Sequence, residues 1–411
     1  MTELVMREGN AMTDEIWQAK LSRTREAWRQ WCAALERTGV TALENTLTRE
    51  EIDLAEGLRY LTRNVRLALL SVMENDDPAH PYLHRSLGPS LKMGGDNPCG
   101  LYLSAPLNGS DTYRVSGTRG SATWVSFMAQ RSHECFAHGL GVFGDAIFTP
   151  ELEVAPDGTF EMILSPREQA GNWIETDRFA SFLSIRQFFG DWDDVRPMDL
   201  TIENVSRGRE VKSTLSLDGA LAQLARSAQM FGLYVPAMQS EMQSKGGSVN
   251  AFATDIGDPT SNFGGVPGGN AVTTRWRLAA GEALVAHVRP PAPCPYWDVQ
   301  VGNLWYESWD YRHFFSGLTC RQAALHDDGS VTIVVSEHDP GVRNWLETAG
   351  HRQGHMAIRW QLTEGQLPLP TCTVVEVHKV AALTGLPAIA ADERRAQRRL
   401  QRAAVDRRFR L

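Results

Sequence analysis

The sequence predicts an α+β fold, in which N-terminal helices are followed by an antiparallel β-sheet region with further helices and a C-terminal arginine-rich helix. Apolar residues recur every three or four positions through the first seventy-odd residues, which is the period of an amphipathic helix. From about Leu101, strand-like segments are grouped instead of alternating with helices as in βαβ folds. We therefore divide the chain into a helical N-terminal region (1–100), an α+β core (101–380) and a basic C-terminal helix (381–411).

The N-terminal region contains two predicted helices. The first is TDEIWQAKLSRTREAWRQWCAALERT, which begins at Thr13. The second is TREEIDLAEGLRYLTRNVRLALLSVME, in which Thr48 and Glu51 have the spacing of a capping box. Both segments place an apolar stripe along one side, so each is expected to pack against the rest of the chain.

The core contains strand-like segments such as YRVSGTRGSATWVSFMAQ, TFEMILS and DLTIENV, separated by turn residues. The run FASFLSIRQFFGDWDD fits either a helix or a buried strand, and its length favours a helix. A further helix is predicted over 217–245, with Pro236 as a kink or a stop. No internal repeat is evident in the sequence.

The segment YWDVQVGNLWYESWDYRHFF, residues 296–315, holds three tryptophans and three tyrosines. Adjacent residues of an extended segment point to opposite sides, so Tyr296 and Trp297 should face different surroundings. We expect one side to pack in the core and the other to face a pocket.

Composition excludes several classes of protein. A net charge of −8 argues against a general nucleic-acid binder, and no apolar run approaches the roughly 20 residues that span a bilayer. The N-terminus lacks a signal-peptide pattern, and the six cysteines are dispersed without a CxxC pair, as is typical of reduced thiols. We expect a cytoplasmic protein that binds neither nucleic acid nor membrane.

The last twenty-one residues hold eight arginines. Three acidic residues interrupt this run, and the rest of the chain is acidic, which favours a solvated helix end over a nucleic-acid arm. The helix would dock on a partner subunit or on the chain's own acidic body. We expect a homo-oligomer.

No phosphate loop, nucleotide fingerprint, serine-hydrolase elbow or zinc-protease motif is present. His133 and His138 flank Cys135, a weak metal pattern, since tight sites need three or more converging ligands. We expect no cofactor and no metal. Several polar side chains instead stand among aromatic ones, and together they suggest a small-molecule pocket with aromatic walls.

Four segments carry a family resemblance: GGDNPCGLY, SIRQFFGDWD, YWDVQVGNLWYESWDY and SEHDPGVRNWLETAGHRQGHMAIRW. They resemble the bacterial family known as domain of unknown function 1214, and the resemblance covers roughly residues 50–365. Cys99 and Glu347 depart from its usual pattern, where an acidic residue and an aspartate stand.

The resemblance implies a link to cofactor-independent lyases that release formaldehyde from lignin-derived phenolic dimers to give a stilbene. Such a reaction needs a base, a group that stabilises phenolate charge and aromatic walls. The candidate bases or proton donors are Tyr60, Lys92 and His351. The candidate substrate-binding residues are Arg63, Asn64, Asp96, Tyr102, Trp173, Arg186, Trp297 and Trp305.

Two alternatives stay open. The first is a non-catalytic binding protein or carrier for an aromatic, steroid or lipid ligand, which would use the same pocket without a tuned base. Dispersed positions of Tyr60, Lys92 and His351 would favour this carrier. The second is a sugar-processing protein, which needs a pair of carboxylates. The carboxylates to compare are Asp96, Asp191, Glu307 and Asp310.

Overall fold

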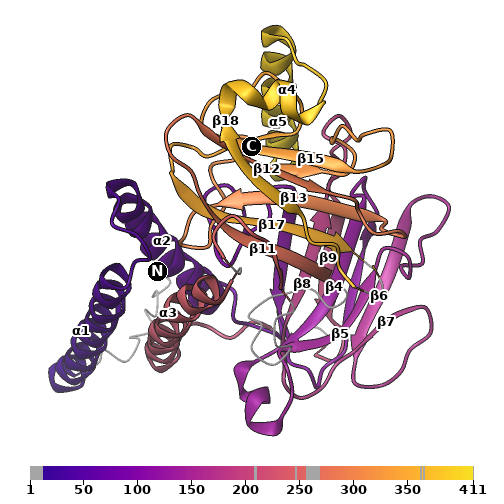
Figure 1. Ribbon diagram of the computed structural model, residues 1–411. Helices are drawn as coiled ribbons and strands as arrows, with labels where there is room; N and C mark the ends of the chain where they lie inside the picture. The colour runs from indigo at the N-terminus through magenta and orange to yellow at the C-terminus, as the bar shows by residue number, and fades with distance from the viewer. Residues whose placement is uncertain are drawn as a thin grey trace, which may run out of the picture.

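The structure, a computed structural model, describes residues 13–207, 211–245, 248–255, 269–361, 363 and 366–410. Its helices and sheets confirm the α+β class (Figure 1). The α-helices are α1 (Asp14–Glu44), α2 (Glu51–Leu69), α3 (Leu217–Ser244), α4 (Val380–Thr384) and α5 (Ala391–Phe409). A π-helical turn, Leu70–Glu74, extends α2.

The first half of the β region is a sandwich of two sheets. One sheet has the strand order β1-β2-β8-β4-β5 and the other β7-β6-β3-β9. Phe127 of β4 packs edge-on against Phe160 of β6 between them, with ring centroids 5.7 Å apart. The strands are β1 (His84–Leu87), β2 (Gly100–Pro106), β3 (Tyr113–Thr118), β4 (Trp124–Arg131), β5 (Phe143–Phe148), β6 (Thr159–Ser165), β7 (Asn172–Glu175), β8 (Ala180–Phe188) and β9 (Asp199–Asn204).

The second half is another sandwich. Its sheets have the orders β10-β11-β17-β13-β14 and β16-β15-β12-β18. The strands are β10 (Ala253–Asp255), β11 (Gly269–Arg277), β12 (Glu282–Val288), β13 (Tyr296–Gly302), β14 (Gly317–Thr319), β15 (Val331–Ser336), β16 (Trp345–Glu347), β17 (Gln353–Gln361) and β18 (Thr371–Glu376).

The two sandwiches repeat one topology. Adding nine to each strand number of the first half gives the strand order of the second, and β6–β7 and β15–β16 are both parallel pairs. The side-chain bonds repeat as well. Asn172 and Asn344 each donate to two backbone carbonyls and accept from a backbone N–H, and the indoles of Trp173 and Trp345 each donate to the carbonyl of a serine.

The prediction of no internal repeat was therefore wrong. The halves share short stretches such as NWIET and NWLET, residues 172–176 and 344–348, and an Ile-Arg pair on β8 and β17. Between these stretches the apolar residues differ in identity while keeping the alternation of a strand, so the repeat is carried by structure more than by letters.

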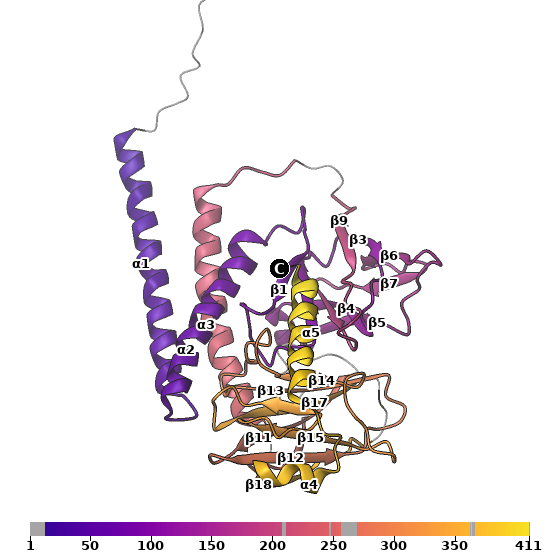
Figure 2. The same ribbon diagram turned by 90° about the horizontal axis from the view of Figure 1, so that it is seen from above.

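Three long helices form a layer beside the sandwiches (Figure 2). The α1 indole of Trp31 donates to Ser227 of α3, and Tyr60 of α2 donates to the carbonyl of Val235 in α3, at 3.0 and 2.9 Å. Pro236 lies inside α3, and the helix continues past it. Among the described residues, no helix is long and apolar enough to cross a bilayer.

Two local expectations differ from the structure. Residues 180–188 form the strand β8 at the centre of a five-stranded sheet, not a helix. Six consecutive positions at its end are buried because both faces are covered, and such a strand lacks the alternation that would distinguish it from a helix. Thr48 does not cap α2, which begins at Glu51, and its hydroxyl instead donates to the carboxylate of Asp53.

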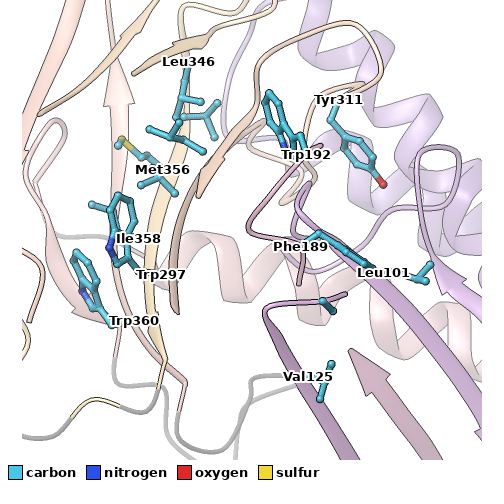
Figure 3. Close-up of a cluster of buried hydrophobic side chains, with 14 of the residues drawn as sticks. Leu101, Val125, Phe189, Trp192, Trp297, Tyr311, Leu346, Met356, Ile358 and Trp360 are labelled. Atoms are coloured by element: carbon cyan, nitrogen blue, oxygen red, sulfur yellow. The ribbon is translucent and has the colours of Figure 1, made fainter. Parts of the chain in front are cut away.

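Each sandwich encloses apolar side chains, and the two cores join (Figure 3). Trp297 of β13 packs near Trp360 of β17, with ring centroids 6.0 Å apart, in the core of the second sandwich. Tyr296 lies on the opposite face of β13 with Trp124 and Phe188. The prediction that Tyr296 and Trp297 face different surroundings is confirmed.

The arginine-rich helix α5 docks on the chain's own acidic residues. Arg394 forms two bonds to Asp339, and Arg398 bonds Glu347 at 2.7 Å, both in the second half. Farther along, the buried Arg408 donates to the carbonyls of Pro98 and Gly100, which lead into the first half. One helix thus links both sandwiches.

Candidate functional site: a buried polar layer between the sandwiches

The inner sheets of the two sandwiches each present a polar face toward the other. In the first, β2, β8 and β4 align Tyr102, Arg186 and Ser126 in one row. In the second, β13 and β17 align Asp298 with Arg359. The Ile-Arg repeat thus places Arg186 and Arg359 at equivalent positions on the central strands of the two sheets. We call Tyr102, Ser126, Arg186, Asp298, Gln300, His355 and Arg359 the polar layer.

The loop before β2 joins the two faces. The backbone N–H of Asn97 donates to the Tyr102 hydroxyl at 3.0 Å, and its side-chain amide donates to Asp298 at 2.7 Å. The carbonyl of Gly95 accepts from Gln300 at 3.0 Å and from Arg359 at 2.9 Å. The two bonds from the buried Asn97 fix the positions of the Tyr102 hydroxyl and the Asp298 carboxylate.

The electrostatics of the layer are dominated by its two guanidinium groups. Burial lowers the pKa of Arg186 to about 10, and the positive charge of Arg359 pushes it the same way. Burial raises the pKa of Asp298, although Arg359 and Asn97 oppose that shift. Burial also lowers the pKa of His355 to about 4, so this imidazole is neutral at pH 7. In each of these groups burial therefore disfavours the charged form, and Arg359 opposes that effect only for the Asp298 carboxylate.

An aromatic wall lies beside the arginines. Phe188 packs within 5.8 Å of Tyr296 and within 5.3 Å of Trp124, measured between ring centroids, and Tyr102 meets Phe188 edge-on. Tyr296 and Phe188 come from facing sheets, so this wall spans the same junction as the arginines. Cationic groups next to aromatic rings suit a flat anionic molecule.

Lys92 and Asp96 lie in a second buried cluster, around the turn that follows β13. The Lys92 ammonium donates to the Ser308 hydroxyl at 2.5 Å and to the Trp309 carbonyl at 2.6 Å, and it stands 4.2 Å from the Tyr311 ring centre. Asp96 accepts from the Ser308 N–H and hydroxyl. Burial lowers the pKa of Lys92. Its donors are engaged by the turn, so Lys92 holds the turn in place.

Arg63 and Glu307 form an ion pair in the same cluster. Glu307 is fully buried, and its Oε1 has no hydrogen-bond partner. Burial raises the pKa of Glu307 to about 8, although Arg63 opposes that shift. The carboxyl is thus one that changes its charge close to neutral pH.

Tyr60, Asn64 and Trp305 lie where α2 meets the turn. The Tyr60 ring packs 5.1 Å from the Trp305 ring, and Trp305 donates to the Asp53 carbonyl at 2.7 Å. The Asn64 amide donates to the Tyr60 carbonyl. Burial raises the pKa of Tyr60, and its hydroxyl is already bonded to α3, so this phenol has little acid–base capacity.

His351 stacks on Trp309, with ring centroids 4.2 Å apart. Its Nδ1 lies 3.2 Å from the Thr348 carbonyl, which can only accept, so Nδ1 carries a proton. Its Nε2 is buried without a hydrogen-bond partner.

The structure brings together only some of the predicted residues. Tyr102 and Arg186 share the polar layer, and Arg63, Lys92 and Asp96 share the cluster at the turn. Trp297 points into the apolar core (Figure 3), and Trp173 lies on the edge strand β7. Tyr60, Lys92 and His351 surround the 305–311 turn but bond to different partners.

Sequence reasoning did not select Asp298, Gln300 or His355. The signal was the alternation in YWDVQVG and GHMAIRW, where the polar residues Asp298, Gln300, His355 and Arg359 all fall on one face of their strands. Among the described residues, no group of three or more His, Cys, Asp or Glu side chains could hold a metal ion. His133 and His138 form part of a short 3-10 helix.

The comparisons identify relatives but no activity. A solved structure of an uncharacterised protein from Burkholderia cenocepacia is 34% identical, with a TM-score of 0.81 over 89% of this chain and 99% of that chain. A protein from Vibrio parahaemolyticus is 12% identical, with a TM-score of 0.43 over 77% and 97%. None of the curated proteins matches.

One family model, described as "Protein of unknown function (DUF1214)", matches residues 103–190 and 285–364. The first region spans β2 to β8 and the second runs from within β12 through β17, so each matched region falls in one sandwich. Both arginines of the polar layer lie inside the matched regions. The chain belongs to the DUF1214 family.

Proposed function

We propose that the chain binds a small aromatic molecule with one anionic group, a carboxylate or a phenolate, in the polar layer between the sandwiches. The observation that carries this proposal is the placement of Arg186 and Arg359 on facing sheets, close enough for one charge to act on the other. Arg186 is buried and the Arg359 side chain is 20% exposed, so each cation raises the free-energy cost of the other. An anion between them would lower that cost.

The neighbouring residues fit such a ligand. Asp298 offsets part of the positive charge, so one negative group on the ligand balances the layer. The wall of Tyr102, Trp124, Phe188 and Tyr296 would contact the ring. Guanidinium groups form paired bonds with carboxylates and are weakly hydrated, which suits a buried anion site.

The test compares 4-hydroxybenzoate with its neutral amide, followed by calorimetry and by tryptophan fluorescence. The acid should bind and the amide should not. Arg186→Gln should weaken binding of the acid about 10- to 100-fold, because a bond to a charged group contributes about 1.5–3 kcal/mol. Arg114→Gln, on the exposed face of β3, is the matched control. Equal binding of acid and amide, or no effect of Arg186→Gln, would contradict the proposal.

A second candidate is the cofactor-independent lyase acting on a phenolic dimer. The observation that favours it is the buried His351 Nε2, which has no hydrogen-bond partner while Nδ1 bonds to the Thr348 carbonyl. Such a nitrogen can take the proton of a primary alcohol, and the adjacent C–C bond then breaks to release formaldehyde. The electron pair of that bond forms the stilbene double bond and expels the oxygen leaving group on the neighbouring carbon.

Phenolic dimers carrying a primary alcohol, incubated with metal-stripped protein, test this candidate. Formaldehyde and stilbene absorbance should rise together, and His351→Asn should slow both about 10²–10⁴-fold. His338→Asn, at an exposed position, is the control. Binding without either product would leave the carrier and remove the lyase.

A further inference from the structure

A groove on the outer face of the second sandwich holds two histidines. It has a volume of about 420 Å³ and lies between the hairpin that precedes β15 and the short helix α4. His287 comes from β12 and is exposed, and His326 comes from the hairpin and is half-buried. We call this the two-histidine groove; its lining residues include Val285, His287, His326, Asp328, Thr332 and Leu383.

The two imidazoles converge on one point. Thr332 is the direct cross-strand neighbour of His287, and its hydroxyl lies 2.9 Å from His287 Nδ1 and 2.8 Å from His326 Nε2. The ring centroids are 5.6 Å apart. Two imidazoles bound to one metal ion through nitrogens about 2.0–2.1 Å away have ring centres about 4.5 to 6 Å apart, so the present spacing is that of a chelating pair.

We propose that the two-histidine groove binds a first-row transition-metal ion, Cu²⁺ foremost, through His287 and His326. Imidazole nitrogen suits copper, nickel and zinc, and affinity for a given site is highest for Cu²⁺ among these ions. The Thr332 hydroxyl lies between the two imidazole nitrogens. When the metal ion binds, this hydroxyl would rotate away or act as a weak third ligand. Solvent completes the coordination, since the groove is open to it.

The site differs from a closed metal centre. Asp328 lines the groove, but its carboxylate is held by Ser330 and Arg289. Two nitrogens without a third protein nitrogen or sulfur make a site of moderate affinity. Its occupancy would therefore follow the concentration of free metal ion. The ion would tie β12 to the hairpin across the edge of the groove.

Tag-free, metal-stripped protein titrated with CuSO₄ tests the proposal by calorimetry and by electron paramagnetic resonance. One equivalent of Cu²⁺ should bind with nitrogen hyperfine structure from two imidazoles. His287→Ala and His326→Ala should each lower the affinity at least tenfold. His378→Ala, 73% exposed and on the neighbouring segment, is the matched control and should leave binding unchanged.

Thermal unfolding gives an independent measurement. Cu²⁺ should raise the Tm of the wild type and of His378→Ala but not of the two groove variants, because a ligand that binds only the folded state stabilises it. The metal-free Tm of each variant shows whether it folds. Unchanged Cu²⁺ binding in both folded groove variants, or no bound Cu²⁺ in the wild type, would overturn the proposal.

Discussion

The two sandwiches have the same strand order, yet they use the position beside their central arginine differently. In the first half, Arg186 stands next to Ser126 and Tyr102. In the second half, Arg359 stands next to Asp298 and donates to Gln300 and Gly95. Arg359 therefore braces a loop, while Arg186 stands between a hydroxyl and a phenol on the neighbouring strands of its own sheet. The repeated strand order gives the two arginines equivalent positions, and the residues that differ between the halves determine what each arginine contacts.

The strand topology that the two halves share can be tested at its equivalent tryptophans, Trp173 and Trp345. Trp345 is 5% exposed and packs against Phe315 under the cations of Arg394 and Arg398, whereas Trp173 at the equivalent position is half-buried. Trp345→Ala should lower the free energy of unfolding by about 3–5 kcal/mol, and Trp173→Ala by about half as much. Urea denaturation measures both. Equal losses would mean that the two halves contribute alike.

The turn between β13 and β14 carries a carboxyl whose titration can be followed. Glu307 has a folded-state pKa of about 8 and an ordinary value of 4.5, so the folded state keeps a proton that the unfolded state has released between those values. Stability should therefore fall as pH rises through this window, by at most about 1.4 kcal/mol per pH unit. It should level off above the folded pKa.

The variant Glu307→Gln should lose this slope, because a neutral amide does not titrate. Chemical denaturation at a series of pH values from 5 to about 9 measures it. Glu203→Gln, on an exposed strand, should keep the wild-type slope. A wild-type curve that is flat over this range would show that Glu307 is charged throughout.

His355 should produce the opposite dependence at lower pH. Its folded-state pKa of about 4 lies below the ordinary 6.5, so the unfolded state takes up a proton first. Stability contributed by the neutral imidazole is present above pH 6.5 and is lost as pH falls toward 4. The equivalent position on β8 is Phe182, which cannot titrate, so His355→Phe should flatten this acidic limb. An unchanged acid midpoint would assign the limb to other groups.

The smallest effect is expected at Ser126. Its buried hydroxyl has no hydrogen-bond partner, so Ser126→Ala should change the free energy of unfolding by about 0.5 kcal/mol or less. Asp298→Ala, at the equivalent position of the second half, breaks the bond from Asn97 and should cost more. A large loss at Ser126 would show that its hydroxyl is part of a structural network.

Much of the fold was readable from the sequence. The helices α2 and α3 followed from apolar spacing, and β6 and β9 from alternation between turn residues. The strand β8 was predicted as a helix, because both of its faces are buried and polar residues such as Arg186 and Gln187 stand among the apolar ones without a regular strand period. The repeat was missed because it is carried by topology, with only a few identical residues such as Asn172 and Asn344 at matching places.

The site was only partly accessible for a related reason. Arg186 and Tyr102 could be selected because they stand among aromatic residues in a dense motif. That Arg359 faces Arg186 depends on how two sheets oppose each other, and no local spacing encodes that relation. Similarly, the bonds of Lys92 to Ser308 and Trp309 join positions more than 200 residues apart.

The helix α5 has a consequence for how the molecule is made. It follows both sandwiches in the chain, and its arginines reach residues of the second half at one end and the approach to β2 at the other. Each sandwich can fold as a unit during synthesis, because domains generally fold one after another from the N-terminus onward. The link that α5 makes between the two sandwiches can therefore form only after both have been synthesised.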